Sequence, residues 1–298
     1  MPYTLITGQF HIHYPDIPRQ GPEPDGDTLK FEPDNRALVD ALGQAVGVTP
    51  DFNGRGMINL RFEGIDALEL HFSEMHQHQG WSEAARDAVL RMAGFRQVRF
   101  YADLPHKVQS VQNHPRPGYI LTRTLDTYGR IICFVFAGPA NDPDGTSVWL
   151  EGPQLNRSMN ARLMAAGLVY PAFYTSLPAE LRDHLAARAV RAWNQGQGLW
   201  PDDTANKIWL QQIPNLATLE PLALWPKLFR RLSKYFAAGN NGLAGFDAWL
   251  RADPTNRDDR ILLSNGDIVN MHNVVETQGN YIRMTEWPED IVILPDNA

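Results

Sequence analysis

The order in which hydrophobic periodicity changes along the first 200 residues is the strongest constraint on the fold. Apolar and polar residues alternate in short segments, which is the spacing of half-buried strands. The predicted strands cover 6–14, 28–31, 57–65, 95–101, 119–125 and 131–137. Helical spacing appears at 36–46, 81–92, 155–166 and 178–194. Because the helix at 36–46 has the position of an insertion, the underlying order is strands, helix, strands and two helices, which predicts a mixed α+β domain.

The predicted helices are bounded by residues that favour helix ends. Ser82 is the expected N-cap of the helix over 81–92, because a serine hydroxyl can accept a hydrogen bond from a free N–H of the first turn. Gly94 is expected to end that helix, and Gly167 to end the helix over 155–166, since glycine adopts the left-handed conformation at low cost.

The pattern changes after residue 200. A helix is predicted around 222–238, followed by a Gly-Asn-Asn-Gly breaker at 239–242 and short strands from 260 to 294. We therefore expect two domains, at 1–201 and 202–298. The second is an appended α/β extension whose expected role is to restrain or target the first.

Composition narrows the class of protein. With 27 Lys+Arg against 34 Asp+Glu the formal charge is −7, which argues against a surface that attracts nucleic acid everywhere but leaves room for a local basic site. Cys133 is the single cysteine, and it fits best as a small buried hydrophobe in a reducing compartment. The N-terminus lacks the pattern of a secretory signal, and no window approaches the ~20 apolar residues that span a bilayer. These features predict a cytoplasmic protein without a membrane partner.

Three short clusters carry residues that could perform chemistry. Residues 25–28 read Asp-Gly-Asp-Thr, which is typical of a tight turn and, alternatively, of oxygen ligands for Ca²⁺ or Mg²⁺. Arg61 lies on a strand, with Asp66 and Glu69 at its end and just beyond, where functional sites are often built. A solvated strand end with weak surface ion pairs is the alternative there. Residues 128–130 read Tyr-Gly-Arg, a hairpin turn that delivers an arginine to a buried strand.

Together the clusters contain the groups that phosphodiester hydrolysis requires. A metal ion polarises the phosphoryl oxygens, a carboxylate orients or deprotonates water, and guanidinium groups stabilise the charge that builds on the equatorial oxygens. The order and spacing of these residues resemble the staphylococcal nuclease (thermonuclease) family. Arg61, Asp66 and Glu69 repeat the spacing of that family's arginine, aspartate and glutamate. The segments 163–170, taken as helical, and 196–200 resemble its closing helices, so the resemblance covers about residues 5–201.

The resemblance implies a fold and a metal site. The fold would be a five-stranded OB-type β-barrel with flanking helices, and the site would bind one Ca²⁺, with Mg²⁺ or Mn²⁺ as alternatives. Asp27 and Asp66 would supply the metal carboxylates, and the backbone carbonyl of Ala67 a further oxygen. Asp25 would support these ligands through hydrogen bonds.

Catalytic and substrate roles follow from the same resemblance. Glu69 would act as general base or position the attacking water, and Arg61 and Arg130 would bind the phosphate and stabilise the transition state. The nucleotide would contact three tyrosines, Tyr128, Tyr170 and Tyr174. The expected function is that of a metal-dependent endonuclease with DNA, RNA or both as substrate.

The sequence departs from the family pattern in several places. Ala67-Leu68 stands where the family has Thr-Pro, which removes a rigid φ and a hydroxyl. Thr127 stands where a lysine usually precedes Tyr-Gly-Arg, and the chain is acidic where familiar secreted relatives are basic. Lower non-specific affinity for DNA is therefore expected. Extra segments before residue 25, between 28 and 61, and between 69 and 128 could narrow or gate the substrate channel.

A catalytically inactive OB-type module that binds nucleic acid or a peptide is the alternative function. The presence of all five charged groups, Asp27, Arg61, Asp66, Glu69 and Arg130, argues against it, because degenerate modules typically lose several of them.

Other charged and polar residues are interpreted more simply. His71, His76 and His78, together with His11 and His13, are taken as polar residues rather than a second metal site, since zinc sites normally show a recognisable ligand spacing. A basic helix face is taken chiefly as solvated, with phosphate contact as the alternative. Its members are Lys227, Arg230, Arg231 and Lys234.

Overall fold

The computed structural model describes residues 2–208 and 210–294, which pack into two units. Unit 1 comprises Met1–Glu63 and Ala84–Leu163, and unit 2 comprises Gly64–Glu83 and Met164–Ala298. The boundary predicted after residue 201 lies within unit 2, and a separate role for residues 202–298 stays a prediction. None of the helices in the described ranges combines the length and the hydrophobicity needed to cross a bilayer.

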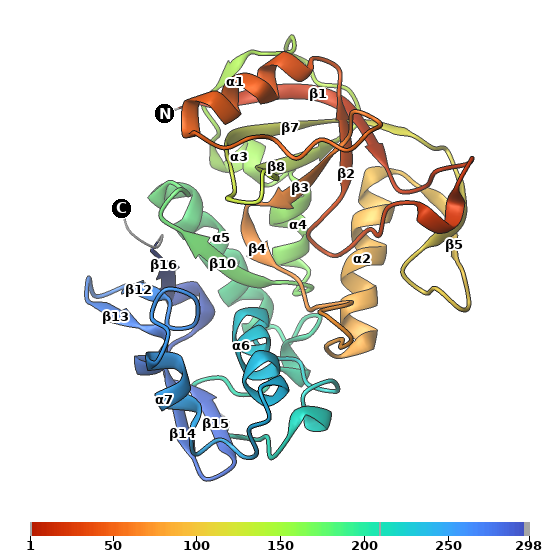
Figure 1. Cartoon of the computed structure of the whole chain (residues 1–298). Coiled ribbons are helices and arrows are strands. Elements are labelled where there is room, and N and C mark those ends of the chain that lie inside the picture. Colours follow the sequence, from red (N-terminus) through yellow and green to blue (C-terminus); the bar gives the residue numbers. More distant parts are fainter. Residues whose placement is uncertain (1, 209, 295–298) are drawn as a thin grey trace. The chain divides into compact units, whose positions relative to one another are not determined.

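Unit 1 is built on a closed five-stranded barrel (Figure 1). Its strands are β1 (Tyr3–His11), β2 (Lys30–Pro33), β3 (Ile58–Phe62), β7 (Arg116–Leu125) and β8 (Ile131–Ala137). They pair in the order β1-β2-β3-β8-β7, and β7 pairs with β1 to close the barrel. Only β3 and β8 run parallel within this ring. The topology is consistent with an OB-like barrel and confirms the predicted α+β class with five barrel strands.

The sequence of β3 shows why this segment lines the barrel. Ile58, Leu60 and Phe62 are fully buried, whereas Asn59 and Arg61 on the other face are half-buried. A strand turns alternate side chains to opposite faces, so the apolar row fills the barrel and Arg61 stays available to polar partners. The predicted orientation of Arg61, away from the apolar row, is confirmed.

Barrel strand β1 covers Tyr3–His11 where 6–14 was predicted. Outside the barrel ring, the elements of unit 1 follow the predicted periodicity only in part. The strands outside the barrel ring are β5 (Arg96–Phe100), β6 (Val108–Gln112) and β9 (Ser147–Val148). Helix α1 (Arg36–Val46) has the predicted bounds, and the side chain of Asn35 caps it by accepting from the Ala37 N–H at 3.1 Å. Helix α2 (Gln79–Ala93) begins before Ser82, whose hydroxyl donates to the Gln79 carbonyl at 3.1 Å instead of capping the helix. The N-cap assigned to Ser82 is therefore wrong, while Gly94 ends the helix with a φ of 89° as predicted.

The single helix predicted over 155–166 is also wrong, because the structure breaks it into α3 (Gly152–Leu155) and α4 (Met159–Ala165). Ser158 lies at the break. Its hydroxyl donates to the Leu155 carbonyl at 2.7 Å and accepts from the Ala161 N–H at 3.1 Å, which is the geometry of an N-cap for α4. A local side-chain bond thus competes with continuous helix.

Buried Asn160 connects α4 to the barrel. Its amide donates to the carbonyls of Glu63 and Cys133 at 2.9 and 3.1 Å, and its carbonyl oxygen accepts from the Val135 N–H at 3.0 Å. These bonds satisfy backbone groups at the end of β3 and along β8. They fix the chain at Glu63, three residues before Asp66.

Unit 2 contains a second sheet of mixed direction. Its strands follow the order β13 (Ile268–Asn270), β12 (Arg260–Leu263), β16 (Ile291–Ile293), β10 (Tyr170–Tyr174) and β4 (Gly64–Asp66). Strands β10 and β16 are parallel, and the other neighbours are antiparallel. The helical interpretation of 163–170 is thus wrong at its end, since Gly167 has a φ of 65° and Tyr170 begins a strand.

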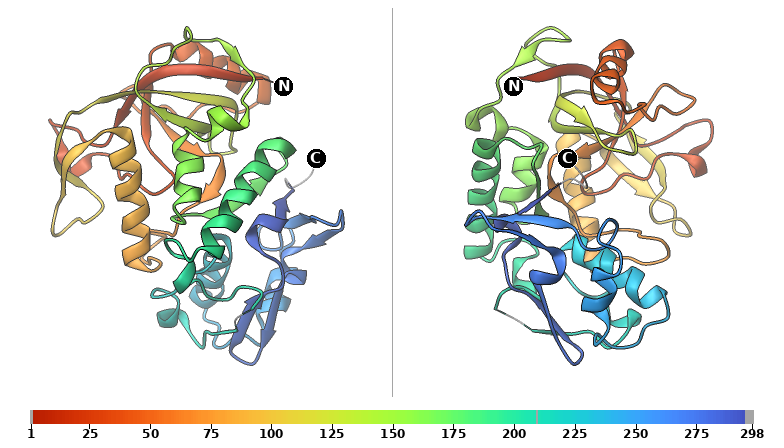
Figure 2. Two further views of the ribbon diagram at one scale, coloured as in Figure 1. Left: turned by 180° about the vertical axis from the view of Figure 1, so that it is seen from behind. Right: turned by 60° about the vertical axis from the view of Figure 1, so that its left-hand side comes forward.

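Helices and a small sheet complete unit 2. The helices are α5 (Ala179–Asn194), α6 (Pro226–Ala237) and α7 (Phe246–Arg251). A three-stranded sheet consists of β11 (Gln211–Gln212), β15 (Tyr281–Met284) and β14 (Val275–Gln278), the last two forming the dark blue hairpin of Figure 2. Helix α5 packs closely on β4, because a Cβ on Gly64 (φ 79°) would lie 2.7 Å from a methyl group of Leu185. Single turns of 3-10 helix lie at Pro18–Gln20, Trp200–Asp202, Leu216–Thr218, Met271–Asn273 and Pro288–Asp290.

A pH-dependent stability is expected from Glu63, which is buried in unit 1 near Tyr3. Burial raises the pKa of Glu63 to about 7, although the Tyr3 hydroxyl donates to its carboxylate at 3.3 Å. The unfolded chain ionises near pH 4.5 while the folded chain keeps the proton up to about pH 7, so stability falls as the pH rises through this window.

The substitution Glu63→Gln removes the ionisation. We expect the free energy of unfolding of this variant, relative to the unsubstituted chain, to increase by about 2–3 kcal/mol between pH 5 and pH 8. Urea unfolding of both proteins at the two pH values measures this difference in the free energy of unfolding. Glu74→Gln, which changes an exposed carboxylate, serves as the control and should show no such pH dependence. An equal difference at both pH values would contradict the assignment.

Candidate functional site

The turn at residues 25–28 brings Asp27 beside Arg61 in unit 1. The Asp25 N–H donates to the Thr28 carbonyl at 3.1 Å, and the Asp25 carboxylate accepts from the Gly26 N–H at 2.6 Å. The backbone N–H of Phe62 donates to the Asp27 carbonyl at 3.0 Å, which ties the turn to β3. Asp27 and Arg61 then form an ion pair in which the two side chains are only 8% and 18% exposed. Asp25 thus stabilises the turn, while its predicted support of the metal ligands stays a prediction.

Arg130 is held in its own hairpin between β7 and β8. The carboxylate of Asp126 accepts from the backbone N–H groups of Tyr128 and Arg130 at 3.0 and 2.9 Å, and from Nε of Arg130 at 2.6 Å. Gly129 has a φ of 79°, and a Cβ there would lie 2.5 Å from the Thr49 carbonyl, so only glycine fits the turn. Tyr128 is 77% exposed, and its ring lies 5.7 Å from the Arg130 guanidinium. Both groups are therefore presented at the tip of the hairpin.

In unit 2, Asp66 and Glu69 both contact Arg230. Asp66 ends β4 and is 2% exposed, and the following residue Ala67 is also buried. The two carboxylate oxygens of Asp66 accept hydrogen bonds from the Arg230 guanidinium at 2.6 and 3.3 Å, and the Glu69 carboxylate accepts from the same group. Arg230 lies on α6, more than 160 residues away in the chain. Sequence spacing predicted that the two carboxylates belong together but gave no indication of this arginine.

The loop that carries Glu69 is held by Gln77. The Gln77 N–H donates to the Glu69 carbonyl at 2.8 Å, and the Gln77 side chain accepts from the Glu69 N–H at 3.1 Å. Its amide also donates to the Leu224 carbonyl at 2.9 Å, next to the start of α6. The same residue therefore fixes both the loop and the chain that leads to Arg230.

The basic face of α6 is mostly paired with carboxylates inside unit 2, so the interpretation as a solvated face is wrong. Lys227 and Arg231 both contact Asp259, at 2.8 and 2.6 Å. Burial alone would raise the pKa of Asp259, but the positive charges of Lys227 and Arg231 outweigh it and hold that pKa below its ordinary value. The helix thus uses its cations to neutralise buried carboxylates.

The two tyrosines assigned to the substrate in unit 2 have different environments. Tyr170 is buried in the hydrophobic core of unit 2, and its hydroxyl donates to Asp203 at 2.5 Å. Burial raises the pKa of Asp203 to about 6, although Tyr170 and Asn206 donate to it. Tyr174 is 38% exposed and its ring lies 5.8 Å from Nζ of Lys227. Tyr174 therefore has surface that a ligand could contact, whereas the ring of Tyr170 is engaged in packing.

Three histidines lie together in unit 1, although the sequence analysis considered only His11 and His13 there. His11 and His13 lie on one side of the chain, and the ring of His114 packs edge-on against both, with centroids 5.2 and 6.1 Å apart. Burial, helped by the charges of the two neighbours, lowers the pKa of His114 to about 4. Its Nε2 accepts from the Ile12 N–H at 3.2 Å. The contacts give this cluster a packing role, which the interpretation of His11 and His13 as polar residues did not predict.

Two of the predicted metal ligands, Asp27 and Asp66, are held by arginines in this structure. Asp27 and Asp66 are buried carboxylates, and carboxylate oxygens are the ligands that Ca²⁺ and Mg²⁺ prefer. Within residues 2–208 and 210–294, no group of three or more His, Cys, Asp or Glu side chains is placed to hold a metal ion. A cation at either carboxylate would therefore compete with Arg61 or Arg230 for the same oxygens.

Comparison with known proteins does not assign a family. No protein-family description matches the chain, and no curated protein matches its sequence. The predicted site residues are thus divided between the units: Asp25, Asp27, Arg61, Tyr128 and Arg130 in unit 1, and Asp66, Ala67, Glu69, Tyr170 and Tyr174 in unit 2. Their convergence on one metal ion stays a prediction.

Proposed function

We propose that this chain is a divalent-metal-dependent nuclease that hydrolyses phosphodiester bonds of DNA or RNA, with Ca²⁺ as the preferred ion. The observation that carries the proposal is the ion pair between buried Asp27 and Arg61 on the wall of an OB-like barrel. A carboxylate and a guanidinium held side by side can bind a metal ion and a phosphate oxygen respectively. The staphylococcal nuclease-like fold and the appended role of residues 202–298 belong to the same proposal.

In this proposal each side chain has a separate task. Asp27, Asp66 and the carbonyl of Ala67 would hold the cation, which would supply charge stabilisation at the phosphoryl oxygens. Glu69 takes the proton of the attacking water while the bond from water oxygen to phosphorus forms and the bond to the leaving oxygen breaks. Arg61 and Arg130 bind the phosphate oxygens, and the exposed ring of Tyr128 is available for stacking on a base.

A catalytically inactive binding module is the second candidate. The observation that favours it is the engagement of both Asp66 and Glu69 by Arg230, which neutralises these carboxylates without a metal ion. A module of this kind would bind nucleic acid or a peptide and leave it uncut.

A cleavage assay separates the two candidates. The purified chain is incubated with supercoiled plasmid, single-stranded DNA and RNA, in Ca²⁺, Mg²⁺, Mn²⁺ or chelator. We expect cleavage that requires a divalent cation and stops with chelator. Metal-independent cleavage would remove the mechanism, and binding without cleavage under every condition would favour the inactive module.

The variant Asp27→Asn tests the metal carboxylate. We expect the cleavage rate to fall by about two orders of magnitude and Ca²⁺ binding, followed by calorimetry, to weaken, because a neutral amide is a poorer ligand for the cation. Asp16→Asn is the matched control: Asp16 also pairs with an arginine in unit 1, but its side chain is 60% exposed. Equal activity of the two variants would contradict the role of Asp27.

A further inference from the structure

A pocket of unit 1 outside the predicted site is lined largely by arginines. It has a volume of about 300 Å³, and its lining residues are Arg91, Gly94, Phe95, Arg96, Asn113 and Arg116. They come from the last turn of α2, the start of β5, the connection after β6 and the first residue of β7. The fold therefore brings four separate segments together around the pocket. None of the predicted catalytic residues lines it.

The charge of this pocket is unbalanced. Three arginines line it, and no acidic residue does. Among the residues that the structure describes, none forms an ion pair with Arg91, Arg96 or Arg116, and Nε of Arg116 is buried without a hydrogen-bond partner. Several other arginines of unit 1 form ion pairs, among them Arg19 with Asp103 at 2.5 Å and Arg86 with Asp87 at 2.9 Å. The chain has a net charge of −7, yet these three arginines lie together without an acidic partner in the described part of the chain. Such a cluster is suited to bind a negatively charged ligand.

The backbone around the pocket is shaped to admit these side chains. Gly94 has a φ of 89°, and a Cβ there would lie 3.0 Å from Nε of Arg116. The absence of a side chain at Gly94 therefore leaves room for the Arg116 guanidinium. Asn113 adopts a left-handed conformation with a φ of 56°. The register of β5 with β6 shifts between Arg96 and Arg99, and such irregularities re-aim side chains.

Helix capping does not account for the arginines. Basic residues near a helix C-terminus often serve the last carbonyl groups. Here the Gly94 N–H donates to the Arg91 carbonyl and the Phe95 N–H to the Leu90 carbonyl, both at 3.1 Å. The end of α2 is thus closed by its own backbone, which leaves the guanidinium groups available for a ligand.

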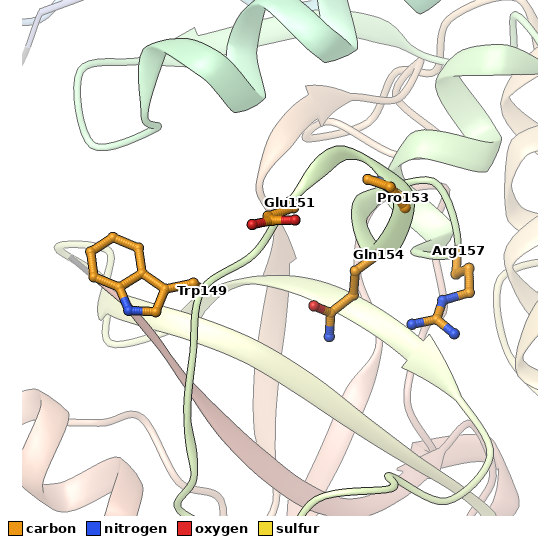
Figure 3. Close-up of a pocket in the computed structure, with 5 residues that line it drawn as sticks. All are labelled: Trp149, Glu151, Pro153, Gln154 and Arg157. Carbon is orange, nitrogen blue, oxygen red and sulfur yellow. The ribbon is translucent and has the colours of Figure 1, made fainter.

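A second pocket of unit 1 provides a contrast. Figure 3 shows its lining residues, Trp149, Glu151, Pro153, Gln154 and Arg157. There a carboxylate accompanies the single arginine, so the lining carries no net positive charge. The arginine pocket is the one whose chemistry specifies a ligand.

We propose that the arginine pocket binds a phosphate group. A phosphate carries up to two negative charges and several acceptor oxygens, and guanidinium groups bind such oxygens in pairs. The side-chain amide of Asn113 adds a neutral donor. The volume lies at the lower end of the range for ligand pockets, which suits one phosphate of a nucleic-acid strand or of a free mononucleotide. The inference does not rest on nuclease activity, because it shares no residue with the proposed catalytic site.

Binding measured in the presence of chelator tests the proposal without any need for the catalytic metal. The probes are inorganic phosphate, adenosine monophosphate and a phosphorothioate single strand of about ten nucleotides. We expect Arg96→Ala and the double variant Arg91→Ala/Arg96→Ala to weaken binding of at least one probe by about tenfold or more, and to lower its salt dependence. Both substitutions lie at exposed side chains, so the fold should survive, which circular dichroism checks.

Arg99→Ala is the matched control, because Arg99 is exposed on the same strand but does not line the pocket. Tight binding of the strand alone assigns the pocket to nucleic acid, and binding of the two small probes assigns it to a free phosphate compound. Affinities that change equally, within about twofold, in the Arg96 and Arg99 variants would overturn the proposal, as would an unsubstituted chain that binds none of the probes. Absence of nuclease activity in the separate cleavage assay would not contradict the proposed phosphate binding.

Discussion

Replacing Arg230 by alanine is expected to lower the free energy of unfolding by about 3–5 kcal/mol at neutral pH. Arg230 contacts both Asp66 and Glu69, whose side chains are 2% and 15% exposed. Removing the guanidinium takes one positively charged partner away from two neighbouring carboxylates in a poorly solvated place, where they repel each other. Urea unfolding measures the loss.

Arg251→Ala provides the control for this experiment. Arg251 also pairs with an acidic residue of unit 2, Asp247, but both side chains are about half exposed, at 55% and 49%. Such surface pairs contribute only about 0–1 kcal/mol. A similar small loss in the Arg230 variant would show that Asp66 and Glu69 do not depend on the guanidinium.

The same variant links stability to the proposed metal site. Because Arg230 and the proposed cation would compete for the oxygens of Asp66, Arg230→Ala should bind Ca²⁺ more tightly than the unsubstituted chain, and added Ca²⁺ should restore part of the lost stability. Calorimetric titration gives the affinity. A loss of stability that Ca²⁺ leaves unchanged would separate the structural role of Arg230 from the proposed metal site.

Glu69→Gln is expected to lower the rate of nucleic-acid cleavage by about three orders of magnitude, as removal of a general base typically does. The amide oxygen of glutamine can still accept from Arg230 and keeps the side-chain volume, so the fold should remain. Single-turnover cleavage of a labelled strand at saturating metal ion measures the rate.

Glu74→Gln changes an exposed carboxylate five residues further along the same loop and is the matched control. It should leave the rate within about twofold of the unsubstituted chain. If Glu69→Gln retained more than about a tenth of the activity, Glu69 could not be the base, and the proton would have to be taken by another group.

Local features of the fold were predictable because they depend on near neighbours in the chain. The bounds of α1, the alternation in β3 and the glycine after α2 follow from period, capping and permitted φ angles. Errors arose where a local pattern admits two outcomes. The apolar run up to Tyr170 fits a helix or a buried strand, and pairing with β4 and β16 decides for the strand.

Site residues were predictable only as far as motif spacing reaches. Asp66 and Glu69 are three residues apart and both contact Arg230, and Asp27 meets Arg61, where a backbone bond ties the turn to β3. Their predicted roles at a metal ion stay predictions. Arg230 was seen only as part of a basic stripe. A stripe on a helix shows which side chains share a face, but not what lies opposite.

The sequence by itself determined the class of the fold, the strands of the barrel and the turns that carry charged residues, because hydrophobic period and turn chemistry act over a few residues. Only the tertiary structure decided which cations meet which carboxylates. Arg230 reaches Asp66 and Glu69 across more than 160 residues, while Arg91, Arg96 and Arg116 gather in one pocket without a carboxylate. Charge pairing depends on distances of a few ångströms in space, and residues far apart in the chain acquire such distances only through folding.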